Sequence, residues 1–169
     1  MFGEKLTLAS DRTFLRLAIE QARKGNTRLG AGDVGCVIVR EGKVLVEAYN
    51  EAELRCDPTA HAEIVGLRKL GKKLRRTSFE GCTLYCTLQP CTMCTSACIW
   101  AKICRIVYGA RRSDVHAMYF DVRHFDSADL VADAFREDLE IVGGVLADEC
   151  AALYYGPYDH PPIREQANL

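Results

Sequence analysis

Apolar residues follow helical spacing in some segments and strand-like runs in others, which predicts a mixture of helices and strands. Near the N-terminus they recur every three to four residues, so we expect a helix that begins near Asp11, with Ser10 as its cap, and ends at Gly25. Downstream, short β-branched runs alternate with further helical patterns. The later expected elements are strands at 34–39 and 44–49, a helix at 61–70, a strand at Cys82–Leu88, a helix at 91–101, a strand at 105–108, a helix at 127–136, a strand at 139–142 and a helix at 146–155.

This order of elements predicts one α/β domain over residues 1–169, in which helices flank a single sheet. No internal repeat, low-complexity tract or linker interrupts the pattern. The segment 156–169 contains three prolines, so we expect regular structure to end there and the tail to be irregular.

Composition agrees with an ordinary globular domain and excludes several other classes. Hydrophobic residues make up 49% of the 169 residues and charged residues 27%, which argues against disorder and against a coiled coil. No apolar run approaches the ~20 residues of a membrane helix, and residues 1–10 contain no apolar signal core, so we expect a cytoplasmic protein with no membrane contact. The net charge of −1 gives no overall case for nucleic-acid binding.

Charge is nevertheless distributed unevenly. Six basic residues lie between Arg68 and Arg76, near the end of an expected helix. Such a cluster is usually a solvated helix end, where cations are favoured, and a phosphate or RNA contact is the alternative. The stretch from Ser113 to Glu149 is by contrast acidic, with ten acidic residues against two basic ones.

Nine cysteines are unusual for a chain of this size. Their odd number, in the absence of a signal segment, argues against a disulfide framework and favours free thiols in a reducing compartment. Five of them lie between Cys82 and Cys98, so this is where we look for a metal site.

A metal-binding pattern is formed by His61 together with Cys91 and Cys94, which follow Pro90. The two cysteines are three residues apart at the expected start of a helix, so they share one face, and the helix N-terminus favours the thiolates that zinc needs. His61 can supply an imidazole nitrogen. Three protein ligands leave the fourth tetrahedral position open for water, which is the pattern of a catalytic zinc.

Glu63 lies two residues after His61, close to the metal but free of it. Zinc lowers the pKa of a bound water to ~7, and Glu63 can then carry protons between that water and a substrate. This chemistry predicts hydrolytic deamination, in which water attacks a ring carbon that bears an exocyclic amine and Glu63 protonates a ring nitrogen and the leaving ammonia.

These motifs match the H-x-E and P-C-x-x-C signature of zinc deaminases, and the sequence resembles the cytidine deaminase-like superfamily from its first helix to about Tyr155. Further matching stretches are 34–39, 57–63 and 83–91. The resemblance implies a three-layer α/β/α sandwich with a mixed sheet, a homodimer, and one Zn²⁺ per chain. Its implied ligands are His61, Cys91 and Cys94.

The resemblance also implies roles for residues around the metal. Glu63 would be the catalytic acid and base, and Asn50 would hydrogen-bond the substrate base. The backbone N–H groups of Ala62 and Cys91 would lie near the reacting centre. Two positions depart from the family pattern: Gln89 stands where many members have glutamate, and Asp33 where relatives often have proline.

Other interpretations of the motifs stay open. The CxxC pair could be a redox site, although no thioredoxin-like pattern surrounds it. A closed structural zinc site could recruit Cys86 or Cys98 as a fourth ligand. The protein could also be a catalytically silent, zinc-stabilised scaffold subunit, but silent relatives usually lose the glutamate that Glu63 retains.

Secondary features favour a small-molecule substrate, a free purine such as guanine or alternatively cytosine. Trp100 matches a tryptophan of guanine deaminases and suits a bicyclic base, with core packing as the alternative. Asp121, or second Asp114, could accept hydrogen bonds from guanine, with a surface acid as the alternative. Cys36 and the segment 91–95 resemble fungal cytosine deaminases.

The second-ranked substrate is adenosine-34 of tRNA, and a free nucleoside is third. Segments 105–110 and 144–150 resemble tRNA adenosine deaminases, but the basic tail of those enzymes is absent here. The cluster between Arg68 and Arg76 is the remaining argument for RNA. The tail 156–169, with its tyrosines, could cap the active site of its own or a neighbouring subunit.

Overall fold

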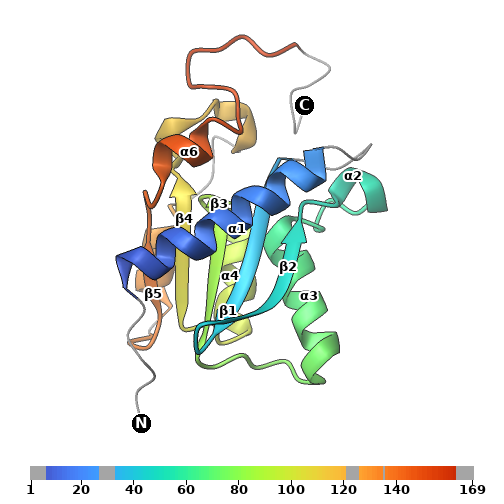
Figure 1. The fold of residues 1–169 in the computed structure, drawn as a ribbon, viewed down its shortest axis with the longest axis vertical. Coiled ribbons are helices and arrows are strands. Elements are labelled where there is room, and N and C mark those ends of the chain that lie inside the picture. Colours follow the sequence, from blue (N-terminus) through green and yellow to red (C-terminus); the bar gives the residue numbers. More distant parts are fainter. Residues whose placement is uncertain (1–6, 27–32, 121–125, 135, 163–169) are drawn as a thin grey trace.

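A five-stranded sheet forms the centre of the protein, and helices cover both of its faces (Figure 1). The computed structural model describes residues 7–26, 33–120, 126–134 and 136–162. The elements in chain order are α1 (Leu8–Asn26), β1 (Gly35–Arg40), β2 (Lys43–Tyr49), α2 (Ala52–Arg55), α3 (Ala62–Leu74), β3 (Cys82–Leu88), α4 (Thr92–Trp100), β4 (Arg105–Ala110), the 3-10 turns η1 (Arg112–Asp114) and η2 (Ala117–Tyr119), α5 (Ser127–Asp133), β5 (Glu140–Val142) and α6 (Ala147–Ala151).

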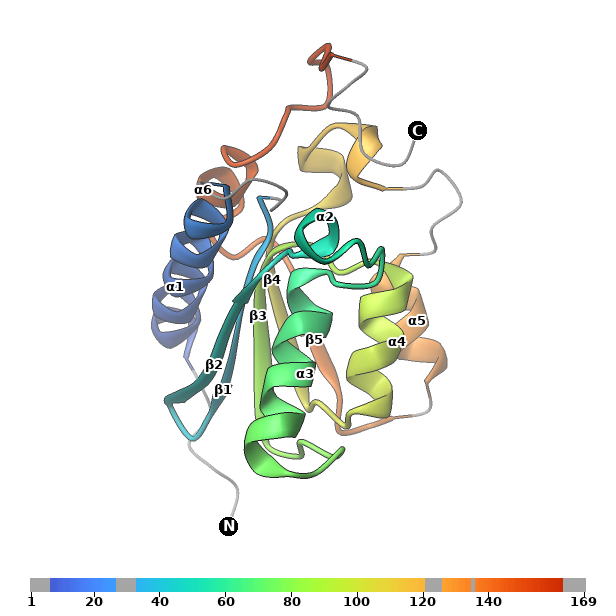
Figure 2. The ribbon, with the colours of Figure 1, turned by 90° about the vertical axis from the view of Figure 1, so that its right-hand side faces the viewer.

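The strands lie in the order β2-β1-β3-β4-β5. Strand β1 is antiparallel to β2 and β3, whereas β3, β4 and β5 are parallel to one another. Figure 2 shows α1 and α6 on one face of this mixed sheet and α3, α4 and α5 on the other. The predicted three-layer α/β/α sandwich is therefore confirmed, and β3 and β4 both end at the same edge of the sheet.

Two hydrophobic clusters fill the space between the layers. Successive side chains of a strand point to opposite faces of a sheet. Cys36 and Ile38 of β1 therefore join the cluster beneath α3 and α4, while Val37 and Val39 join the cluster beneath α1. Burial on both faces accounts for the continuous apolar run that predicted this strand. Within the part of the chain that the structure describes, no helix is both long and apolar enough to cross a membrane.

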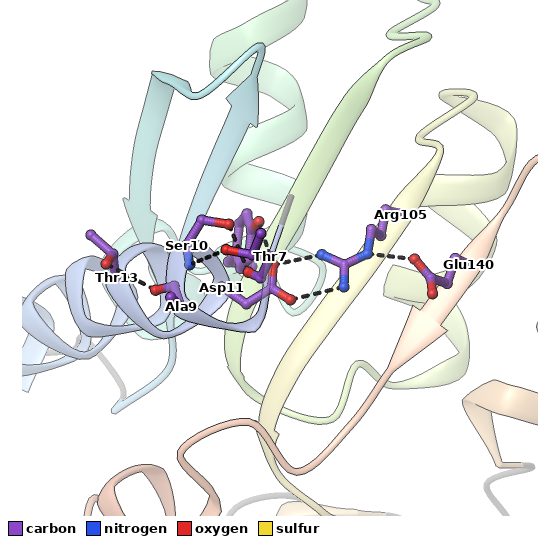
Figure 3. Close-up of polar contacts among 8 residues, drawn as sticks. Thr7, Ala9, Ser10, Asp11, Thr13, Arg105 and Glu140 are labelled. Atoms are coloured by element: carbon purple, nitrogen blue, oxygen red, sulfur yellow. Dashed lines mark hydrogen bonds and ion pairs between the residues drawn. The ribbon is translucent and has the colours of Figure 1, made fainter. Parts of the chain in front are cut away.

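The start of α1 differs from the sequence prediction. The helix begins at Leu8, because Thr7 acts as the cap in place of Ser10: the Thr7 hydroxyl accepts a hydrogen bond from the Ser10 N–H at 3.4 Å (Figure 3). The hydroxyl of Ser10 turns back to the Thr7 carbonyl at 2.7 Å. A one-turn ambiguity of this kind arises wherever two capping residues lie close together in the sequence.

Other boundaries were also predicted wrongly. Helix α3 continues to Leu74, whereas α5 and α6 end early, at Asp133 and Ala151. The chain leaves α6 early, and the Tyr154 hydroxyl forms a 2.6 Å hydrogen bond with Thr87 of β3. Helix α2 and the two 3-10 turns are too short to show a periodic pattern in the sequence.

Candidate active site

The predicted metal ligands lie at the N-termini of two neighbouring helices. His61 is the N-cap residue of α3 and Cys91 is the N-cap residue of α4, and neither side chain caps its own helix. Both side chains are therefore available for other partners. Cys94 follows one turn into α4 and is buried. Helices α3 and α4 pack beside each other on one face of the sheet (Figure 2), which brings the three side chains together.

The geometry of these three residues fits zinc. The Nδ1 atom of His61 lies 3.7 Å from the Cys91 sulfur and 3.6 Å from the Cys94 sulfur. Tetrahedral zinc with bonds of ~2.3 Å to sulfur and ~2.0 Å to nitrogen requires N···S separations of roughly 3.6 Å. All three candidate ligand atoms lie within 4.8 Å of one another. The chain thus offers three ligands in the right positions.

The possible fourth ligands do not join this group. Among the described residues, the only group of three or more histidine, cysteine or acidic side chains close enough to hold a metal contains His61, Cys91 and Cys94 alone. Cys86 and Cys98 are fully buried in the hydrophobic cluster beneath α3 and α4. A closed site with four protein ligands therefore has no support in the structure.

Glu63 is the buried carboxylate of the site. Glu63 lies in the first turn of α3 and is only 3% exposed. Its carboxylate accepts a hydrogen bond from the Cys94 thiol at 3.5 Å. Burial raises the pKa of Glu63, with a further contribution from the nearby Cys91. A carboxyl group of this kind, held beside the ligands without replacing one, is suited to proton transfer.

The two thiols have different proton affinities. Hydrogen bonds, first from Cys94 and then from His61, lower the pKa of Cys91 to about 4. The same interaction with Cys91, followed by burial, raises the pKa of Cys94. The hydrogen bond with Cys91 also raises the pKa of His61. Metal binding requires both sulfurs as thiolates, so an ion at this site would favour deprotonation of both cysteines.

Two of the predicted substrate-binding residues lie in chain segments that adjoin the one carrying His61. The N–H of Glu51 donates to the Ala60 carbonyl at 2.9 Å, which joins the segment after Asn50 to the segment before His61. Asn50 is half-buried, and Ala62 is the buried first residue of α3. The N–H of Ala62 is one of the four at a helix N-terminus that lack an intrahelical acceptor.

The other predicted substrate contacts are not brought to the metal ligands. Trp100 is 86% exposed at the C-terminal end of α4, roughly 13 Å along the helix from Cys91 at 1.5 Å per residue. This exposure also rules out the alternative of core packing. Asp114 hydrogen-bonds the Arg111 N–H at 2.8 Å and the Ser113 hydroxyl at 3.2 Å, so both its oxygens serve its own turn. Asp121 lies outside the described residues.

The structure adds positioning residues that sequence analysis missed. Asp57 accepts hydrogen bonds from the N–H and hydroxyl of Thr59 at 2.9 and 2.6 Å and binds Arg68 at 2.9 Å, which fixes the turn that leads to His61. The Asp57-Pro58-Thr59 sequence is a turn signal that could have indicated this role. Gln89, which stands where many members of the family have glutamate, binds Asp126 of a distant segment. No pattern near Gln89 in the sequence indicates that contact.

A family model, the cytidine and deoxycytidylate deaminase zinc-binding region, matches residues 8–110, which include all three ligands and Glu63. The chain belongs to this family. Its cofactor is accordingly zinc, and as a member of the family it is a hydrolase acting on the C–N bond of a cyclic amidine. The resemblance inferred from the H-x-E and P-C-x-x-C motifs is confirmed, whereas the redox and silent-scaffold interpretations have no support.

Similar proteins include tRNA adenosine deaminases and guanine deaminases. The deaminase is 36% identical, over 89% of its length, to a tRNA-specific adenosine deaminase of Haemophilus influenzae, and covers 84% of that protein. It is 38% identical to a guanine deaminase of Bacillus subtilis, over 64% of this chain and 70% of that one. A structure from a study of tRNA:A34 deaminases superposes with a TM-score of 0.70 at 31% identity, covering 83% of this chain and 98% of the other.

Proposed function

We propose that this deaminase converts an adenine base within tRNA, with adenosine-34 as the candidate position, to hypoxanthine. The observation that carries this proposal is the group formed by His61, Cys91, Cys94 and Glu63, present in a chain that aligns over 89% of its length with a tRNA-specific adenosine deaminase. The proposal reverses the order expected from sequence features alone, which placed a free base first.

The chemistry follows from the residues around the ligands. Zinc, when bound, supplies a water of lowered pKa at the open fourth position. The Glu63 carboxylate moves one proton from the attacking water to ring N1, and then moves the proton of the hydroxyl added at C6 to the departing amine. The C6–O bond forms, the C6–N bond breaks, and ammonia leaves. Burial of Glu63 keeps bulk water from competing for these protons.

The surface that receives RNA is, in this proposal, the one around the N-termini of α3 and α4, where the ligands lie, and not the basic cluster at Arg68–Arg76. That cluster extends over the C-terminal end of α3, whereas His61 lies at its N-terminus. Arg68 is paired with Asp57, and Lys69 and Lys73 donate to backbone carbonyls of β2 at 3.1 and 2.8 Å. Three of the six basic residues therefore bind other parts of the chain. This agrees with the interpretation of the cluster as a solvated helix end and not as an RNA-binding surface.

Deamination of free guanine is the second candidate, favoured by the 38% identity to a guanine deaminase. Recognition of guanine calls for an acceptor for its N1–H and 2-amino groups. Asp114, the described candidate for that role, accepts hydrogen bonds from the Arg111 N–H and the Ser113 hydroxyl, so its orientation is set by its own turn. Four expectations stay predictions. They are guanine binding by Asp121, an active-site cap formed by the tail 156–169, a single domain over residues 1–169, and a homodimer.

The deciding experiment compares substrates directly. Zinc-loaded protein is incubated with an adenosine-34 anticodon stem-loop, guanine, cytosine, adenine and their nucleosides, and both ammonia and the deaminated base are quantified. The proposal expects turnover of the stem-loop alone, abolished by Glu63→Ala with zinc retained. Turnover of guanine but not of the stem-loop would overturn it in favour of the second candidate.

A further inference from the structure

The carboxamide of Gln89 connects three segments of the chain next to the metal ligands. Gln89 is 4% exposed and stands two residues before Cys91. Its Oε1 accepts a hydrogen bond from the Arg112 N–H at 3.1 Å. Its Nε2 donates to both carboxylate oxygens of Asp126 at 3.2 Å and to the Ser127 hydroxyl at 3.0 Å. Every hydrogen-bonding group of this side chain has a partner from another segment.

The backbone of Gln89 is held as firmly as its side chain. Its N–H donates to the carbonyl of Ala110, the last residue of β4, at 2.9 Å. Asp126 is itself the N-cap of α5, because its carboxylate accepts the Ala128 N–H at 2.8 Å. The turn that leads to Cys91, the end of β4 and the start of α5 therefore meet at one buried amide.

Arg112 and Asp126 stand at the two ends of one stretch of the chain. Arg112 opens η1, and Asp126 immediately precedes α5. Near its start this stretch lines a hollow of about 290 Å³, formed by Arg112, Ser113, Ala117 and Phe120. Gln89 therefore joins both ends of the stretch, and one wall of the hollow, to the turn that presents the metal ligands.

The contacts require an amide rather than a carboxylate. An amide both donates and accepts, whereas a glutamate at this position would only accept. A carboxylate could still bind the Arg112 N–H, but it would lose both donors and face the carboxylate of Asp126 at about 3 Å, where two like charges repel strongly. The exchange of a single nitrogen for oxygen thus breaks the Asp126 side of the junction and leaves the Arg112 side in place.

We propose that Gln89 is a positioning residue for substrate recognition, which holds η1 and the start of α5 against the turn that leads to Cys91. It touches neither the metal nor the reacting base. Gln89 positions residues that line the hollow in which we expect part of the substrate to bind. Loss of the Gln89 carboxamide should therefore weaken substrate binding more than it slows the chemical step. The kinetic part of this inference rests on the proposed deamination of tRNA adenosine, and the structural part does not.

The test compares Gln89→Glu, Asp126→Asn and the double variant as zinc-loaded, full-length proteins. Asp126→Asn is the matched control, because asparagine also caps helices and its Oδ1 can still accept from Gln89. In the double variant the amide and the carboxylate exchange places, so the hydrogen bond between them can form again. Damage unrelated to this junction would not be repaired by the second substitution.

We expect Gln89→Glu to raise KM for the stem-loop about tenfold and to leave kcat within about threefold of the wild-type value. An effect of this size is typical when one member of a hydrogen-bonded network is changed. Zinc content should remain one per chain. Asp126→Asn should resemble the wild type, and the double variant should return KM to within about threefold of it. An unchanged KM in Gln89→Glu, loss of its zinc, or no recovery in the double variant would overturn the proposal.

Hydrogen exchange gives a readout that needs no substrate. In Gln89→Glu the amides of η1 and of the first turn of α5 should exchange faster than in the wild type, and the double variant should restore their protection. This result would stand if the wild type failed to turn over the stem-loop, so failure of the proposed function is distinguishable from failure of the junction. Unchanged exchange in Gln89→Glu would contradict the junction itself.

Discussion

The guanidinium of Arg105 on β4 binds the carboxylate of Asp11 on α1 through two hydrogen bonds, of 2.6 and 2.9 Å (Figure 3). The side chains are 17% and 3% exposed, respectively. The Tyr85 hydroxyl of β3 donates to the same carboxylate at 2.9 Å, and Arg105 also binds Glu140 of β5. The pair therefore ties α1 to three strands, one of which, β3, leads into the turn before Cys91.

Removal of the arginine should destabilise the protein strongly. Arg105→Met leaves Asp11 buried with only the Tyr85 hydroxyl as a side-chain donor, and an uncompensated buried charge costs about 3–5 kcal/mol. Glu140→Gln is the matched control: its partner is the same guanidinium, but its side chain is 60% exposed, so we expect a loss of at most about 1 kcal/mol. Urea unfolding of both variants measures the two values. A loss below about 1 kcal/mol in Arg105→Met would mean that the buried pair contributes little.

Zinc binding should depend on Cys91 and not on cysteines elsewhere. Cys91→Ser removes one of three ligands, so zinc should bind more than about 100-fold more weakly and turnover should fall with zinc content. Cys56→Ser, at an exposed cysteine that belongs to no metal group, serves as the control. Competition with a chromogenic chelator measures the affinity, and elemental analysis gives the stoichiometry. Full zinc occupancy in Cys91→Ser would contradict the assigned ligand set.

Glu63 should affect turnover without affecting the metal. Glu63→Gln preserves the size of the buried side chain but cannot take up a proton, so we expect kcat to fall by about 10²–10⁴-fold. Zinc content and the urea midpoint should change little. Glu53→Gln, at an exposed glutamate of α2, removes the same charge nearby and should leave kcat unchanged. Retained activity in Glu63→Gln would require another proton carrier.

The parts of the site that could be predicted are those formed by residues that lie close together in the sequence. His61 and Glu63 lie two residues apart, and Cys91 and Cys94 share a helical turn, so local geometry alone places each pair. The contact between Gln89 and Asp126 joins segments that pack only after the sheet has formed, and no pattern in either segment indicates it. The sequence likewise does not indicate that Trp100 lies exposed at the end of α4.

Helix ends were the least predictable part of the fold. Thr7 and Ser10 are both good caps, and the structure places Thr7 at the cap and Ser10 in the first turn of α1. Strand β1 was easier to predict, because burial on both faces makes it continuously apolar. A sequence pattern thus identifies elements that bury their own residues, and it fails where a distant partner determines the boundary.

The basic cluster offers a test of where RNA binds. Lys72, Arg75 and Arg76 lie at the end of α3 opposite to His61. Their combined substitution by alanine should leave KM for the stem-loop within about threefold and should not alter its dependence on salt, because that slope counts the phosphates that a protein neutralises. A KM increase above about tenfold, with a shallower salt slope, would place RNA on this helix end.

The turn before His61 should make stability depend on pH in the acid range. The Thr59 hydroxyl, the Thr59 N–H and then Arg68 lower the pKa of Asp57 from its ordinary value of 3.8 to about 2. A group whose pKa is lower in the folded state than in the unfolded state stabilises the fold at pH values above the unfolded-state pKa. That contribution disappears as the pH falls through the folded-state pKa. Zinc-free wild type should therefore be more stable than Asp57→Asn between pH 5 and 7, by an amount that shrinks from about pH 4 to pH 2. Urea unfolding at a series of pH values gives this difference. A difference that stays constant down to pH 2 would show that the ionised carboxylate of Asp57 does not stabilise the turn.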